Sequence, residues 1–253
     1  MMSETRPKRP PGRQAGPGTA GIRPLRHARR KAASIAIAIA ALGSAAGSAE
    51  AVGPGEPINA NQALINAARA GSLAKAEALV GAGAAIDSRN RLGNTPLNIA
   101  IQVGSPALAQ RLIALGADVD LPNLSGVTPL MSAAFARDAD TFAALLAARA
   151  DASRTDRVGK TAAVYAAAQG CAGCVRALLD AGTDPNARYD AGLTMLMWAA
   201  GSGQDEVAEL LMARGADGAL PDERGLDAVR IAQDTGHDGL ARRLRAGAPV
   251  PPR

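Results

Sequence analysis

The sequence predicts an all-α solenoid of stacked helix-turn-helix units with projecting turns, and three observations support it. Five glycines recur every 33 residues, at Gly93, Gly126, Gly159, Gly192 and Gly225. A second series lies 23 residues beyond them, at residues 116–118, 149–151, 182–184 and 215–217, and reads Gly-Ala-Asp or a close variant. Aromatic residues make up only 2% of the chain, so the core must use small side chains that let short helices approach closely. Two series in register at one period indicate a repeat architecture.

Each unit carries the start and stop signals of two short helices. The glycine suits a turn that needs positive φ, and the residue two positions later is a helix-capping type in every unit: Thr95, Thr128, Thr161, Thr194 and Asp227. A first helix is expected from there, over 96–103 and 129–136 for example, and a second over 107–114 and 207–213. A glycine at 116, 182 or 215 then ends the second helix.

The pattern Thr-Pro-Leu, Ala, Gly, Leu-Leu, Gly-Ala-Asp resembles the ankyrin repeat. The resemblance implies six units in a domain spanning 58–246, at 58–89, 90–122, 123–155, 156–188, 189–221 and 222–246. The first and last are degraded, as expected of caps that turn one face to water. It also implies a concave face formed by the first helices.

Two departures from the family pattern carry expectations of their own. The histidine usual after Thr-Pro-Leu is replaced by Asn98, Met131, Val164 and Met197, so its hydrogen bonds to neighbouring turns are expected to be missing. Arg137 stands in place of the mid-repeat glycine of the third unit.

The basic charge of the chain belongs to its N-terminus. Residues 1–51 hold nine Lys/Arg and two Glu, a net of +7, which leaves 19 basic and 21 acidic residues in 52–253. An uncharged run over 32–46 precedes Ala49-Glu50-Ala51, so 1–51 is predicted to be a secretory signal with a basic lead, cleaved after Ala51 or Ala49. Residues 52–57 form a linker, and 247–253 a Pro-rich tail.

Export predicts a periplasmic or secreted protein. Arg29-Arg30 leaves the twin-arginine and general secretory routes both open. The alternative is an uncleaved segment, 32–49, that tethers the chain to the inner membrane, although that run is short and half alanine.

The sequence offers little for catalysis, a cofactor or a metal, so we expect a protein that is not an enzyme. It contains no Walker-type loop and no Gly-x-Ser-x-Gly motif, and His237 is the one histidine beyond the signal. His237 occupies an inter-helix position where the ankyrin resemblance implies a structural role. Asp118, Asp120, Asp151, Asp184 and Asp217 recur once per unit or nearly so, which fits turn formation better than calcium binding.

Cys171 and Cys174 form a Cys-x-x-Cys pair where an inter-helix turn enters the second helix. Three interpretations remain open: small packing residues, a local disulfide, or a redox pair with a thiol activated near a helix N-terminus. The pair lacks a flanking tryptophan and a βαβ context.

A partner is expected to bind at the turns and along the concave side of the first helices. The candidate contact residues are Arg91, Leu92, Asn94, Gln102, Leu124, Val127, Phe135, Arg157, Val158, Lys160, Gln169 and Leu193. Phe135 is the best single candidate, whereas Phe142 is expected on the packed face of a second helix and Trp198 in the core.

The most direct prediction is therefore an exported, monomeric protein-protein interaction scaffold that binds a partner protein and neither nucleic acid nor, after signal cleavage, membrane. The alternative is a redox-linked accessory protein that uses Cys171 and Cys174. Nucleic-acid binding through the basic N-terminus would require that segment to be retained.

Overall fold

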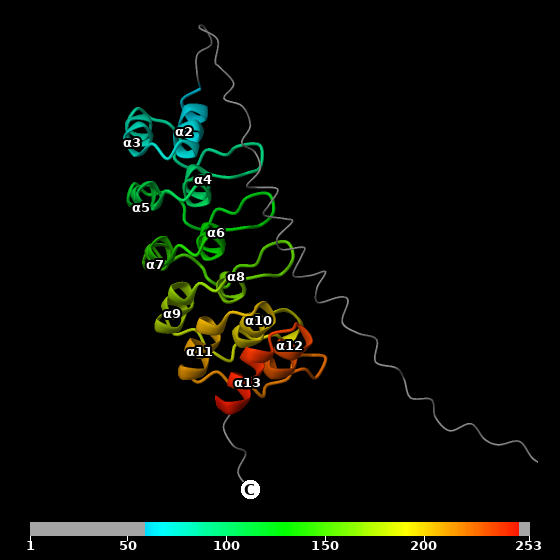
Figure 1. Ribbon diagram of the computed structural model, residues 1–253. Helices are drawn as coiled ribbons and strands as arrows, with labels where there is room; N and C mark the ends of the chain where they lie inside the picture. Colours follow the sequence, from blue (N-terminus) through cyan, green and yellow to red (C-terminus); the bar gives the residue numbers. More distant parts are fainter. Residues whose placement is uncertain (1–58, 248–253) are drawn as a thin grey trace, which may run out of the picture. The chain divides into compact units, whose positions relative to one another are not determined.

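A computed structural model describes residues 59–247, and the predicted signal, the linker and tail residues 248–253 lie outside them. The described residues form helices and turns without a β-strand, which confirms the all-α solenoid (Figure 1). One helix of each pair lies on the side from which the long loops project, and we call these the inner helices: α2 (Ala60–Arg69), α4 (Pro96–Gln102), α6 (Pro129–Ala136), α8 (Ala162–Gln169), α10 (Met195–Ser202) and α12 (Ala228–Asp234). The outer helices are α3 (Leu73–Gly81), α5 (Pro106–Ala114), α7 (Ala139–Ala147), α9 (Ala172–Asp180), α11 (Asp205–Ala213) and α13 (Asp238–Gly247).

The inner helices begin where the sequence places their caps. The hydroxyl oxygen of Thr95 accepts a hydrogen bond from the Asn98 N–H at 3.2 Å, and Thr128, Thr161 and Thr194 cap their helices in the same way. Asp227 does so for α12 with its carboxylate. Each cap satisfies a backbone donor that the first turn of a helix leaves without a partner. This local chemistry fixes the point at which each loop gives way to a helix.

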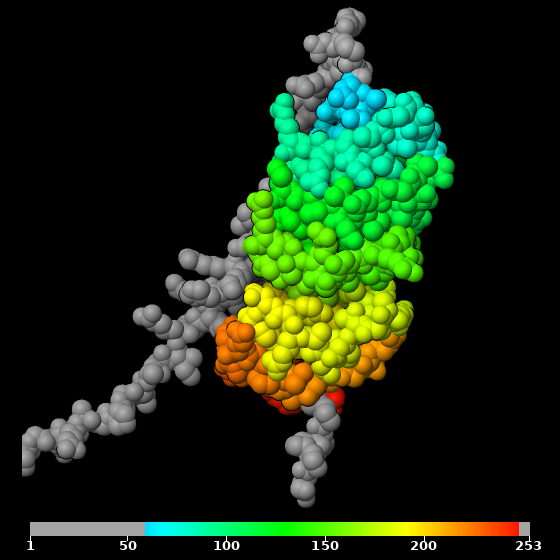
Figure 2. Space-filling model, turned by 180° about the vertical axis from the view of Figure 1, so that it is seen from behind, coloured from blue at the N-terminus to red at the C-terminus, as the bar shows by residue number. Residues whose placement is uncertain are grey.

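A column of alanines lets the inner helices pack against one another. Ala100, Ala133, Ala166, Ala199 and Ala232 are 33 residues apart, and all five are fully buried. Larger groups such as Leu108 and Phe142 fill the space toward the outer helices, and Phe142 is buried on α7 as expected. Successive units therefore stack as bands in chain order (Figure 2). Small side chains in the column explain how a chain so poor in aromatic residues buries a continuous core.

Acidic residues in the turns after the outer helices link successive units. The Asp118 carboxylate accepts from the N–H of Asp120 at 2.8 Å, which closes the local turn. The Asp120 carboxylate in turn accepts from the N–H of Asp151 in the next unit at 2.9 Å. The expected turn role of these aspartates is confirmed. The side chains that bridge the units belong to a second series, Asp87, Asp120 and Asn186, which accepts from the backbone N–H groups of Asp118, Asp151 and Asp217.

The expected loss of hydrogen bonds at the histidine positions is wrong for one unit. Asn98 donates from its side-chain nitrogen, at 3.1 Å, to the carbonyl of Leu121, at the end of the same unit just before the turn of the next one. Met131 and Met197 make local contacts instead, each accepting weakly through sulfur from the N–H of its own capping threonine at 3.5 Å.

Candidate partner-binding surface

Five loops project beside the inner helices, and we call them fingers 1 to 5: residues 90–94, 123–127, 156–160, 189–193 and 222–226. Asn or Asp opens four of them, and its side-chain oxygen accepts from two backbone N–H groups. In finger 2, Asn123 accepts from Ser125 at 2.9 Å and from Val127 at 3.1 Å. The glycine of each finger has positive φ, for example +79° at Gly126. A side-chain cap and a left-handed glycine together make each of these fingers a defined turn.

Neighbouring fingers are joined by backbone hydrogen bonds, except at one step. The N–H of Leu124 donates to the carbonyl of Leu92 at 3.0 Å, and the N–H of Arg157 donates to the carbonyl of Ser125 at 3.1 Å. Fingers 4 and 5 are joined likewise, from Glu223 to Ala191 at 3.2 Å. Between the described fingers 3 and 4, the equivalent bond from residue 190 to residue 158 does not form. Fingers 1 to 3 therefore make one hydrogen-bonded group, and fingers 4 and 5 another.

Finger 4 differs because its first residue is Tyr189, where the other fingers have Asn or Asp. Residues Asp190–Gly192 form a short 3₁₀ turn (η1), and Ala191 adopts a left-handed φ of 58°. A surface cleft of about 490 Å³ opens here, lined by residues that include Thr155, Thr183 and Tyr189. Burial, together with the nearby Asp184, raises the pKa of Tyr189 to about 12. A tyrosine cannot cap a turn as a short polar side chain does, which accounts for the altered finger.

Aromatic side chains gather on the inner-helix face beside finger 3. The rings of Phe135 and Tyr165 meet edge to face, with centroids 6.4 Å apart. The Tyr165 hydroxyl donates to the carboxylate of Asp156 at 2.6 Å, and the Lys160 ammonium lies 4.2 Å from the centre of the Trp198 ring. Burial, and then the hydrogen bond to Asp156, raise the pKa of Tyr165. We call Phe135, Tyr165 and Trp198 the aromatic row.

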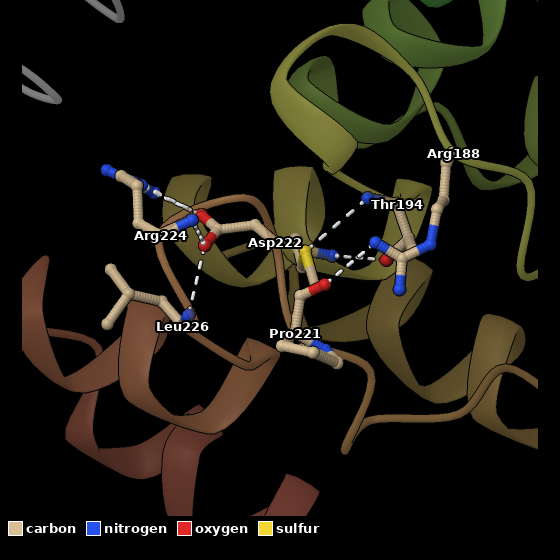
Figure 3. Close-up of polar contacts among 7 residues, drawn as sticks. Arg188, Thr194, Pro221, Asp222, Arg224 and Leu226 are labelled. Carbon is tan, nitrogen blue, oxygen red and sulfur yellow. Dashed lines mark hydrogen bonds and ion pairs between the residues drawn. The ribbon is translucent and has the colours of Figure 1, made fainter.

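Finger 5 is held by arginines on both sides (Figure 3). Arg188 reaches from the preceding loop and donates to the carbonyl of Pro221 at 2.8 Å. The Asp222 carboxylate accepts from the guanidinium of Arg224 and from the N–H of Leu226. Burial favours the protonated form of Asp222, but these hydrogen bonds outweigh it, so its pKa lies below the ordinary value. The Asp222 carboxylate thus stabilises the conformation of finger 5 through hydrogen bonds within that finger.

The structure divides the twelve candidate contact residues by exposure. Six are exposed: Arg91, Leu92, Gln102, Leu124, Arg157 and Val158. Three are half-buried: Phe135, Gln169 and Leu193.

The remaining three candidates, Asn94, Val127 and Lys160, are buried, so their expected exposure at the tips is wrong. They follow the finger glycine, and the chain turns inward there toward the inner helix; the exposed residues of fingers 1 and 3 precede the glycine. Trp198 is also corrected, because it is only half-buried and faces Lys160.

Tyr165 and Asp156 escaped the sequence analysis as members of this surface. A signal for Tyr165 was present: the position four residues after each cap holds Ile99, Ser132, Tyr165, Trp198 and Ile231, so aromatic groups occupy it in two adjacent units. Comparing units at this position would have paired Tyr165 with Trp198, whereas Phe135 lies at another position of its unit. The link to Asp156 could not be found that way, because it depends on how close the finger lies to the helix.

Cys171 and Cys174 form a disulfide at the start of α9. The sulfur of Cys171 accepts from the N–H of Cys174 at 3.2 Å, in the place of an N-cap, and both residues are buried. Two of the three open interpretations, packing and a local disulfide, therefore hold together.

The remaining titratable groups do not assemble a metal site within residues 59–247, where no cluster of three His, Cys, Asp or Glu side chains occurs. The imidazole of His237 lies where a Cβ on Gly203 would come within 2.6 Å of its ring, so it packs against the backbone of the preceding unit. No helix among the described residues is long and apolar enough to span a membrane.

Comparison with known proteins agrees with this geometry. The family model described as ankyrin repeats (3 copies) matches residues 47–123, 64–156 and 130–222. The chain belongs to the ankyrin repeat family. No curated protein sequence matches it.

Two solved structures are similar to this ankyrin repeat chain. The ankyrin repeat protein EF0377 is 29% identical, with a TM-score of 0.67 over 75% of this chain and 98% of its own. The ankyrin repeat domain of Bcl-3, described as a unique member of the IkappaB protein family, is 27% identical, with a TM-score of 0.65 over 74% of this chain and 86% of its own. Ankyrin repeats generally mediate protein-protein interaction, and their fold is typically a non-enzymatic scaffold.

Proposed function

We propose that the protein is an exported scaffold that holds a partner protein against the aromatic row and the neighbouring fingers. The row is the observation that carries this proposal. Half-buried Phe135 and Trp198 flank Tyr165 on the side of the inner helices that faces the loops, whereas the other aromatic side chain of the helices, Phe142, is buried in the core. Aromatic groups that are partly exposed and held rigidly are typical centres of protein interfaces.

The polar neighbours of the row support a role in binding. Lys160 lies over Trp198, and the Tyr165 hydroxyl is bonded to Asp156, so two of the three rings are held in place before a partner arrives. A surface whose rotamers are fixed in advance loses less conformational entropy on association. The indole nitrogen of Trp198 is shielded from solvent and makes no hydrogen bond within the described part of the chain, so the exposed part of the Trp198 side chain that a partner could contact is its apolar ring surface.

Export is supported by the basic lead and apolar run of the first 51 residues and by the disulfide in the repeat domain, since disulfides persist in oxidising compartments. The proposed signal and the alternative tether, residues 32–49, both fall outside the described residues. The intact mass of the exported protein distinguishes cleavage after residue 49 or 51 from retention of the segment.

The test is capture of partners from a periplasmic extract by the full chain and by Phe135→Ala. We expect the variant to lose most of the captured protein while its melting temperature stays within a few degrees of wild type. Leu115→Ala, at an exposed position beyond the end of α5, is the matched control and should capture as wild type does. Unchanged capture by Phe135→Ala, together with a melting temperature lowered by several degrees, would show that the ring serves the core only.

The second candidate function, a redox accessory using the Cys171–Cys174 disulfide, rests on the bond itself. Burial of both residues opposes it, because a redox-active sulfur must be reachable by another protein. Thiol labelling of the folded protein with and without reductant, compared with Cys174→Ser, decides the matter. Labelling that reductant does not change rules out a redox role.

A further inference from the structure

Fingers 1 to 3 present exposed apolar side chains in succession. Leu92, Leu124 and Val158 are 49%, 54% and 66% exposed, more than any other large apolar side chain in the described residues. Each is at or next to the tip of its own finger, in consecutive units. Scattered apolar residues at a surface are ordinary, but three in adjacent loops form a patch.

Backbone contacts join the three fingers that carry this patch, and the patch stops where these contacts stop, between fingers 3 and 4. The bonds from Leu124 to Leu92 and from Arg157 to Ser125 fix fingers 1 to 3 relative to one another. A Cβ at Gly126 would lie 3.0 Å from the Arg157 nitrogen, whereas one at Gly159 would have no neighbour nearer than 4.0 Å. Finger 3 therefore packs closely on finger 2 and is separated from finger 4. We call fingers 1 to 3 the three-finger platform.

The exposed charged side chains within the platform are basic. Arg91 and Arg157 are exposed in fingers 1 and 3, and Arg89 and Arg154 are exposed just before the same two fingers. The one carboxylate within fingers 1 to 3 is Asp156, which is buried and bonded to Tyr165. Asp87 and Asp120, which lie just before fingers 1 and 2, accept hydrogen bonds from backbone N–H groups of the following unit.

Fingers 4 and 5, beyond the missing hydrogen bond, carry exposed carboxylates at Asp190 and Glu223, and the exposed Arg224 of finger 5 is already paired with buried Asp222. The change of charge thus coincides with the break in the finger ladder. The platform is distinct from its neighbours in both respects.

We propose that the three-finger platform binds an acidic segment of the partner protein in which carboxylates alternate with apolar side chains. This inference rests on the proposed scaffold function and names the chemistry of its partner. The apolar side chains would cover Leu92, Leu124 and Val158, while the carboxylates would pair with Arg91 and Arg157 in the two-point geometry that guanidinium groups favour.

Two other anionic occupants fit less well. A nucleic acid would be expected to stack its bases on aromatic groups, and the platform has none, since the aromatic row lies on the inner helices. Stable membrane attachment needs a larger apolar area than three separate side chains supply.

The test uses labelled synthetic peptides of alternating glutamate and leucine with serine spacers, and fluorescence anisotropy with the full chain. Three peptides separate the contributions: the acidic apolar one, one with lysine for glutamate, and one with serine for leucine. We expect the first to bind about tenfold or more tightly than either of the others, and to weaken as salt is raised. The basic N-terminal segment is common to all variants, so differences among variants report on the platform.

Paired variants locate the site. The double variant Arg91→Glu/Arg157→Glu should bind the acidic apolar peptide about fivefold or more weakly than wild type. The control is the double variant Arg176→Glu/Arg242→Glu, whose arginines are exposed on the outer helices α9 and α13, and it should bind as wild type does. Leu124→Ser should weaken binding, and Leu115→Ser should not. Thermal melts establish that each variant is folded.

The inference would be overturned if the Arg91→Glu/Arg157→Glu and Arg176→Glu/Arg242→Glu double variants bound the acidic apolar peptide equally well. The inference would also be overturned if the protein bound phosphatidylglycerol vesicles but not the peptides, and if that vesicle binding required Arg91 and Arg157. If the peptides fail while capture of a partner still depends on Phe135, the scaffold function stands and only the chemistry assigned to its partner is wrong.

Discussion

Tyr165→Phe removes one hydrogen bond from the middle of the candidate surface and leaves the ring in place. The lost bond is the 2.6 Å contact from the hydroxyl to the Asp156 carboxylate, between two buried residues. Hydrogen bonds to charged groups contribute roughly 1.5–3 kcal/mol to stability, and Asp156 keeps its bonds from the N–H groups of Val158 and Lys160. We therefore expect a loss of about 2 kcal/mol at pH 7, or roughly 4–8 °C in melting temperature for a domain of this size.

The same substitution makes a prediction about pH. The pKa of Tyr165 is raised in the folded state, so above pH 10 the unfolded chain releases this proton while the folded chain keeps it. Stability then falls as pH rises, by about 1.4 kcal/mol at pH 11 for one tyrosine with an ordinary unfolded pKa. Phenylalanine has no such proton, so the difference between wild type and Tyr165→Phe should shrink from about 2 to about 0.6 kcal/mol at pH 11.

Urea unfolding followed by circular dichroism at pH 7 and pH 11 measures both effects. Tyr189→Phe is the control, because among the described residues its hydroxyl makes no hydrogen bond, although burial and Asp184 raise its pKa to about 12. The control should be nearly neutral at pH 7 and stabilise the protein at pH 11. A Tyr165→Phe protein as stable as wild type at pH 7, or a difference that does not shrink with pH, would refute the role assigned to this hydrogen bond.

Three further experiments test the fingers, the end of α6 and the disulfide by chemical denaturation. Gly126→Ala should lower the free energy of unfolding by about 1 kcal/mol more than Gly159→Ala does, because the two glycines have nearly the same φ but only at Gly126 would a Cβ meet the Arg157 nitrogen. Equal losses would contradict close packing of fingers 2 and 3. Arg137→Gly should stabilise the chain by roughly 0.5–1 kcal/mol, since this residue adopts a left-handed φ of 58° at the end of α6, and Arg137→Ala should give no such gain. Reduction of the disulfide should destabilise the wild type by about 2 kcal/mol, as expected for a four-residue loop. The stability of Cys174→Ala should not change with reductant. A wild type whose stability does not change with reductant would show that the disulfide does not support the fold.

Periodicity alone predicted the helices of this protein well. The expected first helix over 129–136 coincides with α6 (Pro129–Ala136), and the expected second helix over 107–114 begins one residue late relative to α5 (Pro106–Ala114). These limits depend on capping and on glycine, which act within a few residues of the chain, so the sequence carries them directly. The family resemblance was confirmed by the match of the ankyrin repeat family model and by the two similar solved structures.

The sequence predicted the surface less well, because exposure depends on which side of the finger glycine a residue occupies. Leu92 and Val158 precede the glycine and are exposed, whereas Val127 and Lys160 follow it and are buried. Asn98 was expected to lose its contact with the neighbouring turn and instead reaches the Leu121 carbonyl. Such errors concern side chains whose environment is supplied by residues distant in the sequence, as Leu121 is from Asn98 and Trp198 is from Lys160.

The sequence by itself determined the fold, the register of the units and the use of small side chains in the core, since all three follow from spacing, composition and short-range chemistry. Only the tertiary structure decided that the finger ladder breaks between fingers 3 and 4, that Phe135, Tyr165 and Trp198 form one row, and that Asp156 is bonded within it. These are distances between units. A backbone hydrogen bond forms or fails over a fraction of an ångström, and such distances depend on how all the neighbouring side chains pack together.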